Sequence, residues 1–214
     1  MIAVFGGTFD PIHYGHLRPL WEVKQVLGLE EVRLIPCFIP PHRDAPGATA
    51  EQRLEMLQLA LKSVPGFVID ERELQRGGPS SYMVDTLQSL RDELGQTPLC
   101  LIMGLDAFLG LESWYQWQRL HELAHIIVTQ RPGSELPEDG TVAELINKTR
   151  AKDVSELFAQ AAGKTYFQPV TQLDISATAI REQIACGQDV RFLMPDSVRH
   201  YIETEGLYTT ERAK

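Results

Sequence analysis

The stretch GGTFDPIHYGH, residues 6–16, joins the apolar run of residues 1–5 to a segment in which Leu17 and Leu20 recur at helical spacing. The pattern predicts a strand before the stretch and a helix after it. Two glycines at such a joint let the backbone turn sharply and come close to a ligand. A helix that begins near His16 directs free N–H groups and its positive dipole end at the same place, so the stretch predicts an anion-binding site.

The remainder of the chain repeats this order of strand and helix. Further strands are predicted over residues 31–38, 66–73, 98–104, 124–130 and 165–170. Further helices are predicted after residue 49, over residues 81–94 and 114–123, after residue 176, and over residues 197–208. Regular alternation of this kind is typical of the α/β class. We therefore expect a doubly wound parallel sheet, with a small C-terminal helical part.

Local signals mark several element ends. Thr49 and Gln52 have the spacing of a capping box. Ser176 occupies a predicted N-cap, and Gly206 is expected to stop the last helix. Residues 134–164 break the rhythm, and they are predicted to be a polar, partly helical excursion before the sixth strand.

Composition limits the class of protein. The chain has 214 residues, of which 43% are hydrophobic and 23% are charged, and this suits a single domain over residues 1–214. No apolar run reaches the roughly 20 residues of a membrane span, and no secretory leader is evident, so we expect no membrane partner and a cytoplasmic location. A net charge of −9 argues against nucleic acid as a partner, so any anion site must be local.

The spacing of the first glycines excludes two common phosphate-binding motifs, the G-x-G-x-x-G of dinucleotide sites and the Gly-Lys-Ser/Thr of a P-loop. His13 and His16 suggest a different phosphate chemistry. They lie three residues apart, so both imidazoles can donate to phosphate oxygens whose charge grows during displacement. The alternatives are a packing or capping role and a metal pair. Zinc would require further ligands, and the sequence offers no obvious third ligand near this spacing.

The same stretch resembles the signature of the nucleotidyltransferase superfamily, whose H-x-G-H motif binds the nucleotide triphosphate; class I aminoacyl-tRNA synthetases share a related motif. The resemblance extends over almost the whole chain. A similarity to bacterial nicotinate-nucleotide adenylyltransferases is carried by IPPHR (39–43), DERELQRGGPSSYMVDTL (70–87), IMGLD (102–106), SWYQW (113–117), RPG (131–133) and ISATAIRE (175–182). The first motif alone would leave phosphopantetheine adenylyltransferases and cytidylyltransferases open, whereas the later ones point to the pyridine-nucleotide branch.

The resemblance implies transfer of AMP from ATP to nicotinate mononucleotide, which yields deamido-NAD and pyrophosphate in NAD biosynthesis. Mg²⁺ is expected to be carried by the ATP phosphates. The implied catalytic residues are His13, His16 and Arg181. The implied ATP-binding residues are Gly6, Gly7, Thr8, Phe9, Gly104, Asp106, Ser176, Thr178 and Arg181. The implied substrate-binding residues are Arg43, Met83, Thr86, Trp114, Tyr115 and Arg131.

Individual roles follow from the same resemblance. Ser176, Thr178 and Arg181 would hold the pyrophosphate leaving group, and they stand where a capped helix is predicted to start. Asp106 would accept hydrogen bonds from ribose hydroxyls, as a carboxylate can. Trp114 would stack on the pyridine ring.

Two positions depart from the usual pattern of the family. Related sequences usually have threonine, close to the pyridine carboxylate, where this chain has Met83. The backbone N–H of Met83, with that of Tyr115, is expected to serve instead, and Ser80 and Ser81 are candidates to replace the hydroxyl. Arg43 stands where related enzymes often carry lysine, and either residue supplies positive charge to phosphates.

We expect direct in-line attack by the mononucleotide phosphate on the α-phosphorus of ATP. No covalent enzyme intermediate and no side-chain base are needed, because a phosphate dianion is already an adequate nucleophile. Two alternatives remain open. One is an adenylyltransferase for nicotinamide mononucleotide or another phosphorylated acceptor, and the other is a nucleotide-binding sensor without turnover. The oligomeric state is not predicted.

Overall fold

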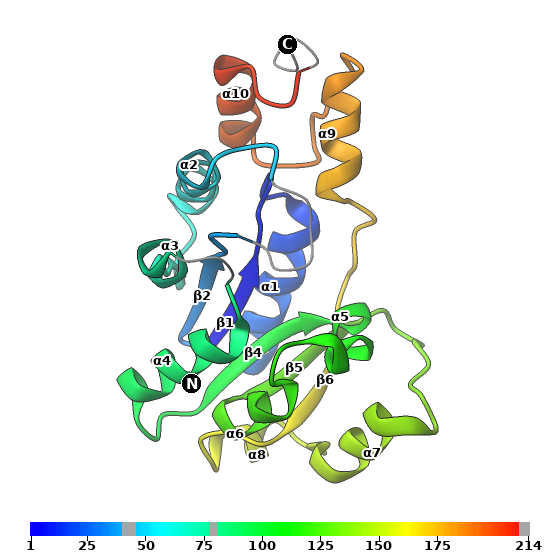
Figure 1. Cartoon of the computed structure of the whole chain (residues 1–214). Coiled ribbons are helices and arrows are strands. Elements are labelled where there is room, and N and C mark those ends of the chain that lie inside the picture. The colour runs from blue at the N-terminus through cyan, green and yellow to red at the C-terminus, as the bar shows by residue number, and fades with distance from the viewer. Residues whose placement is uncertain (40–45, 78–80, 210–214) are drawn as a thin grey trace.

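Parallel strands form the centre of the molecule (Figure 1). The computed structural model describes residues 1–39, 46–77 and 81–209, and within them six strands pair in the order β3-β2-β1-β4-β5-β6. The strands are β1 (Ile2–Gly7), β2 (Glu31–Pro36), β3 (Phe67–Ile69), β4 (Leu99–Gly104), β5 (His125–Gln130) and β6 (Thr165–Pro169). Every pairing is parallel, so the carboxyl ends of all these strands lie at one edge of the sheet.

Helices follow the strands. They are α1 (Tyr14–Leu27), α2 (Ala50–Leu61), α3 (Arg72–Arg76), α4 (Met83–Leu94), α5 (Leu105–Leu109), the 3-10 turns η1 (Leu111–Ser113) and η2 (Trp117–Arg119), α6 (Leu120–Leu123), α7 (Gly140–Thr149), α8 (Ser155–Phe158), α9 (Ala177–Ala185) and α10 (Asp196–Glu205). Figure 1 shows α9 and α10 beyond the end of the sheet toward which β1 points. In the described part of the chain, none of these helices is long and apolar enough to cross a membrane.

Both faces of the sheet are buried. Ala3 and Val32 belong to a cluster on one face that includes apolar residues of α1, α2 and α10. Val4 and Leu101 belong to a second cluster, with residues of α4, α5, α6 and α7. Successive strand residues point to opposite faces, so the neighbours Ala3 and Val4 fall in different clusters. Helices therefore cover both faces, and the predicted doubly wound α/β fold is confirmed.

β1 lies where the strand order reverses. It pairs along its whole length with β2 and, over residues 2–4, with β4. From β1 the chain proceeds through β2 and β3 on one side and then through β4, β5 and β6 on the other. Open sheets of this kind bind ligands outside the carboxyl ends of the strands at this reversal. The stretch 6–16 leaves β1 at that point.

The predicted helix ends are confirmed. The Thr49 hydroxyl accepts from the Gln52 backbone N–H, and the Gln52 side chain accepts from the Thr49 N–H, which completes the capping box of α2. The Ser176 hydroxyl accepts from the Ala179 N–H at the start of α9. Gly206 has a φ of 57° and ends α10 in the left-handed conformation that glycine adopts without strain.

The third strand is shorter than the prediction of residues 66–73. β3 ends at Ile69, because the next residue, Asp70, accepts a hydrogen bond from the Arg72 backbone N–H and turns the chain into α3. The excursion over 134–164 contains α7 and α8, which agrees with the prediction of a partly helical segment.

The helix predicted over residues 114–123 is not continuous. Gln116 has a φ of 52°, so helical backbone begins only at Trp117 and consists of the short turns η2 and α6. The segment before Gln116 leaves Trp114 and Tyr115 in an irregular connection close to the ligand-binding edge of the sheet.

Candidate active site

The turn after β1 is packed too closely for side chains at its glycines. A Cβ on Gly6 would lie 2.5 Å from Met83 Cε, and a Cβ on Gly7 would lie 2.8 Å from the ring of Phe9. Phe9 has a φ of 52° and is buried, so its ring folds back over Gly7. The Thr8 hydroxyl lies 3.7 Å from Cys37 Sγ, at the end of β2.

His13 and His16 face each other across the start of α1. Their ring centroids are 3.8 Å apart and the ring planes are inclined by 25°. His13 is the N-cap of α1, and its carbonyl accepts from the His16 N–H. The helix therefore begins at Tyr14, which agrees with the predicted start near His16. The edge of the His16 ring meets Phe9, at a centroid distance of 5.5 Å.

Burial determines the charge of His13. Desolvation lowers the pKa of His13 to about 4, so the ring is neutral near pH 7. Its Nδ1 is buried and has no hydrogen-bond partner among the described residues. A neutral imidazole still offers one N–H donor, which can bind a phosphate oxygen without neutralising it.

A third segment, the start of α9, approaches the same turn. A Cβ on Gly15 would lie 2.7 Å from the Ile175 carbonyl oxygen, so α1 and the residue before Ser176 are in close backbone contact. Ser176 and Thr178 are exposed on the first turn of α9. Arg181 Nη2 donates to Thr178 Oγ1 at 3.3 Å. The predicted phosphate-binding residues of the two ends of the chain are thus brought together.

Asp10 connects this group of residues, and the sequence analysis did not assign it a role. Its carboxylate accepts from the backbone N–H groups of Gly47 (2.8 Å) and Ala48 (3.1 Å) and from the Tyr208 hydroxyl (2.6 Å). Its backbone carbonyl accepts from Arg181 Nη1 at 2.7 Å. The only available signal was the position of Asp10 inside the 6–16 stretch, and that signal does not identify partners so distant in sequence.

Arg53 is a second residue that the sequence analysis missed. It is 1% exposed on α2, and Nη1 donates to the carbonyls of Thr8 and Cys37, both at 2.8 Å, while Nη2 donates to the Phe38 carbonyl at 3.1 Å. These bonds tie the turn after β1 to the end of β2. A basic residue on the buried face of α2, four positions before Leu57, was the available signal.

The predicted acceptor residues lie around the start of α4. Met83 is the first residue of α4, and its methyl group lies against the Gly6 backbone. Thr86 is fully buried, and its hydroxyl donates to Glu73 Oε1 at 2.6 Å, so it faces inward. Burial raises the pKa of Glu73, although the hydrogen bond from Thr86 opposes this.

Aromatic side chains border this group. The ring of Tyr115 packs on Tyr82, with centroids 4.7 Å apart, and Tyr82 is the N-cap of α4. Tyr115 is 51% exposed, and Trp114 is partly buried against the second core cluster. Both residues therefore keep surface that a planar ligand can contact.

The remaining predicted residues lie at other strand ends. Gly104 ends β4, and Asp106 is exposed in the first turn of α5. Arg131 is exposed just past β5, where Nε donates to Gln172 Oε1 at 3.0 Å and not to another predicted site residue. Arg43 lies outside the described residues.

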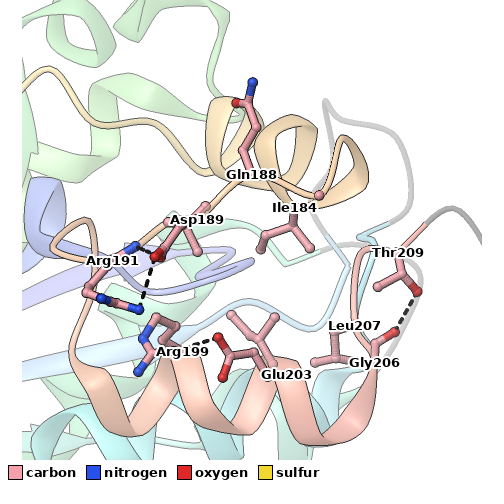
Figure 2. Close-up of a pocket in the computed structure, with 12 residues that line it drawn as sticks. Ile184, Gln188, Asp189, Arg191, Arg199, Glu203, Gly206, Leu207 and Thr209 are labelled. Carbon is pink, nitrogen blue, oxygen red and sulfur yellow. Dashed lines mark hydrogen bonds and ion pairs between the residues drawn. The ribbon is translucent and has the colours of Figure 1, made fainter.

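A separate hollow of about 410 Å³ lies between α9 and α10 (Figure 2). Its lining includes two ion pairs, Asp189 with Arg191 at 3.1 Å and Arg199 with Glu203 at 2.5 Å. The charges in this lining are already paired, and none of the predicted site residues contributes to it. We therefore place the candidate active site at the turn after β1.

The chain is similar to known proteins over almost its whole length. Residues 4–183 match the cytidylyltransferase-like family. The chain is 49% identical over 209 residues to a probable nicotinate-nucleotide adenylyltransferase of Methylococcus capsulatus, with 97% of this chain and 99% of that protein covered. It is 50% identical over 209 residues to a protein of the same name from Halorhodospira halophila, with 97% and 94% covered.

Solved structures support the fold. The Plasmodium falciparum nicotinic acid mononucleotide adenylyltransferase complexed with NaAD matches with a TM-score of 0.71 and 17% identity, over 97% of this chain and 96% of that one. The same enzyme complexed with APC matches with a TM-score of 0.70 and 18% identity, over the same shares of the two chains. By sequence, the chain belongs to the nicotinate-nucleotide adenylyltransferases of the cytidylyltransferase-like family.

Proposed function

We propose that this enzyme joins the AMP moiety of ATP to nicotinate mononucleotide by direct in-line displacement. A phosphate oxygen of the mononucleotide attacks the α-phosphorus, the bond from that phosphorus to the bridging oxygen breaks, and pyrophosphate leaves with the electron pair. The products are deamido-NAD and pyrophosphate. The observation that carries the proposal is the stacked pair His13 and His16, in which His16 packs on Phe9 of the turn after β1 and His13 lies close to Gly15, which contacts the segment before α9.

The triphosphate is assigned to the turn after β1 and to α9. Backbone groups of Gly6, Gly7, Thr8 and Phe9 approach it, because positions 6 and 7 add no side chain of their own to the turn. His13 and His16 donate to oxygens on which charge grows in the transition state. Ser176, Thr178 and Arg181 hold the leaving pyrophosphate at the positive end of α9.

Ribose and acceptor are assigned to the neighbouring strand ends. Asp106, which follows Gly104 at the end of β4, accepts from ribose hydroxyls. Trp114 stacks on the pyridine ring, and the N–H groups of Met83 and Tyr115 bind its carboxylate. Thr86 supports this part of the site through its hydrogen bond to Glu73. Arg43 and Arg131 supply positive charge for phosphates.

Mg²⁺ is assigned to ATP and not to a protein cage. Within residues 1–39, 46–77 and 81–209, no group of three His, Cys, Asp or Glu side chains could hold a metal ion. Mg²⁺ commonly keeps several waters and binds through substrate phosphates, which requires no such group. When bound, it neutralises charge on the leaving pyrophosphate.

We also infer that residues 1–214 act as one domain and that the enzyme works in the cytoplasm, where ATP is available.

The test is pyrophosphate release with ATP and a panel of acceptors. Nicotinate mononucleotide, nicotinamide mononucleotide and phosphopantetheine are each supplied at equal concentration, and the values of kcat/KM are compared. We expect nicotinate mononucleotide to give the highest value. A preference for another acceptor would replace the proposed substrate, and ATP binding without pyrophosphate release from any acceptor would indicate a sensor.

A further inference from the structure

Tyr208, three residues past the end of α10, reaches the predicted catalytic turn. The Tyr208 hydroxyl donates to Asp10 Oδ1 at 2.6 Å, across 198 positions of sequence. Asp10 lies between Phe9 and the His13–His16 pair in the chain. The proposed function uses no residue beyond Arg181, so this contact connects an unassigned segment to the site.

Asp10 holds two parts of the site in place. The residue is 4% exposed, and its carboxylate also accepts from the N–H groups of Gly47 and Ala48. Arg181 Nη1 donates to the Asp10 carbonyl at 2.7 Å and lies 3.7 Å from Asp10 Oδ2. Any rearrangement of this carboxylate therefore acts directly on Arg181.

The backbone before Tyr208 is held in place as well. Gly206 and Tyr208 both have left-handed backbone, with φ of 57° and 63°. Between them Leu207 is buried, lines the hollow between α9 and α10 (Figure 2), and donates its N–H to the Ile202 carbonyl. Burial, together with the charge of Asp10, raises the pKa of Tyr208, so its hydroxyl keeps the proton that it donates.

The absence of a side chain at Gly47 leaves room for the contact between Tyr208 and Asp10. A Cβ at this position would lie 3.1 Å from the Tyr208 ring and 3.5 Å from Arg181 Cδ. The Tyr208 ring, the Gly47 backbone and the Arg181 side chain are therefore packed against one another with no spare space.

We propose that Tyr208 is a positioning residue for adenylyl transfer, which acts through Asp10 on the Arg181 guanidinium. The proposal rests on the proposed function, in which Arg181 holds the leaving pyrophosphate. Without the hydroxyl, a buried carboxylate loses one of its donors. Tyr208 donates to Oδ1, and Arg181 Nη1 lies 3.7 Å from the other oxygen, Oδ2. A carboxylate with one donor fewer carries more uncompensated negative charge, so it attracts the guanidinium more strongly and draws it away from the phosphates.

The test variant is Tyr208→Phe, which removes only the hydroxyl. We expect kcat/KM for ATP to fall about tenfold, the effect of losing one hydrogen bond to a charged group, and the KM for nicotinate mononucleotide to stay within about twofold. Tyr201→Phe is the matched control, because the Tyr201 hydroxyl, on α10, has no hydrogen bond among the described residues. In an Arg181→Ala background, Tyr208→Phe should cause no further loss.

An unchanged kcat/KM for ATP in Tyr208→Phe would overturn the proposal. So would a loss from Tyr208→Phe that is as large in the Arg181→Ala background as in the wild type. If Tyr208→Phe does not fold, Gly47→Ala perturbs the same contact, and normal use of ATP by that variant would overturn it. A wild-type protein without activity would contradict the proposed function alone. The Kd for ATP then decides the role of Tyr208, because equal values for wild type and Tyr208→Phe would exclude it.

Discussion

At the scale of single residues, the stacked imidazoles of His13 and His16 limit how the site can bind phosphate. Two imidazolium rings with centroids 3.8 Å apart would repel each other, and desolvation already lowers the pKa of His13 to about 4. In the proposed mechanism the pair acts through N–H donors and not through two fixed charges. Donors of this kind contribute most where charge grows, at the oxygens of the transferring group.

His16→Ala should lower kcat by roughly 10²- to 10³-fold, the scale for the loss of one preorganised donor. The measurement is pyrophosphate release at saturating ATP and nicotinate mononucleotide. His200→Ala is the control, because His200 is exposed on α10 and outside the site. Near-normal turnover of His16→Ala, with the melting temperature retained, would remove the proposed role.

Met83 is predicted to select the acid, nicotinate mononucleotide, over its amide. As the first residue of α4, it presents a backbone N–H that has no partner within the helix, at the positive end of the dipole. Such a donor suits a carboxylate oxygen and faces an NH₂ group poorly. We expect kcat/KM for nicotinate mononucleotide to exceed that for nicotinamide mononucleotide by at least about tenfold, or roughly 1.4 kcal/mol.

Met83→Pro tests the origin of this preference. Proline is well tolerated at the first position of a helix and lacks the N–H, and Tyr82 already has the extended backbone that a following proline requires. The acid-to-amide ratio should fall toward one in Met83→Pro. The same ratio should be unchanged in Met83→Leu, which keeps the N–H. A ratio that survives the proline would show that other groups select the acid.

At the scale of elements, the contact between α1 and the segment before α9 aligns the two halves of the phosphate site. A Cβ on Gly15 would lie 2.7 Å from the Ile175 carbonyl oxygen, and backbone cannot yield as a flexible side chain can. The contact sets the distance between the histidine pair and the hydroxyl and guanidinium groups of α9.

The same Cβ would also lie 2.9 Å from the His13 ring, so it would displace both sides of the predicted site. Gly15→Ala should therefore lower kcat/KM for ATP by about 10-fold to 10²-fold, because displacements near 1 Å have effects of this size on transfer reactions. Gly110→Ala is the matched control, since a Cβ there would meet Asp106 O at an ordinary 3.6 Å. Steady-state kinetics with varied ATP make the comparison. Equal behaviour of the two variants would mean that the α1–α9 contact does not control the site.

At the scale of the whole molecule, buried histidines link stability to pH. Desolvation lowers the pKa of His13 and of His121 to about 4, and it also lowers the pKa of His125. The unfolded chain titrates near 6.5, so between these values the unfolded state binds more protons than the folded state. The contribution of these histidines therefore leaves the free energy of unfolding at its full value above about pH 6.5, and this free energy declines as the pH falls toward 4.

His121 offers a clean test, because it lies far from the site and its Nε2 contacts Thr165 Oγ1 at 2.8 Å. Between pH 7.5 and pH 5, it should contribute about 2 kcal/mol to the loss in the free energy of unfolding. Urea unfolding at several pH values measures this. His121→Gln should flatten the decline by that amount, whereas His200→Gln should leave it unchanged, and identical curves for all three proteins would contradict the linkage.

Local patterns along the chain were sufficient to predict the strands, the fold class and several helix ends. The periodicity of apolar residues identified every strand and the α/β class, because side-chain direction in a strand or helix follows from backbone geometry alone. The caps at Thr49, Ser176 and Gly206 also depend on neighbours within a few positions. The motif from residue 6 to residue 16 indicated the nucleotidyltransferase superfamily, and the later motifs indicated the nicotinate-nucleotide adenylyltransferases, which the comparisons confirmed. The roles assigned to its residues stay predictions.

The order and type of the elements and the family can be predicted from the order of residues alone, together with the turn proposed to bind phosphate. Four features appear only in the folded chain: the strand order, the close contact of Gly15 with Ile175, the hydrogen bonds from Arg53 to the ends of β1 and β2, and the hydrogen bond of Tyr208 to Asp10. The difference lies in the sequence separation of the partners. Periodicity and caps are local, whereas these contacts join segments separated by tens to nearly two hundred residues, and partners at such separation are chosen by packing of the complete fold.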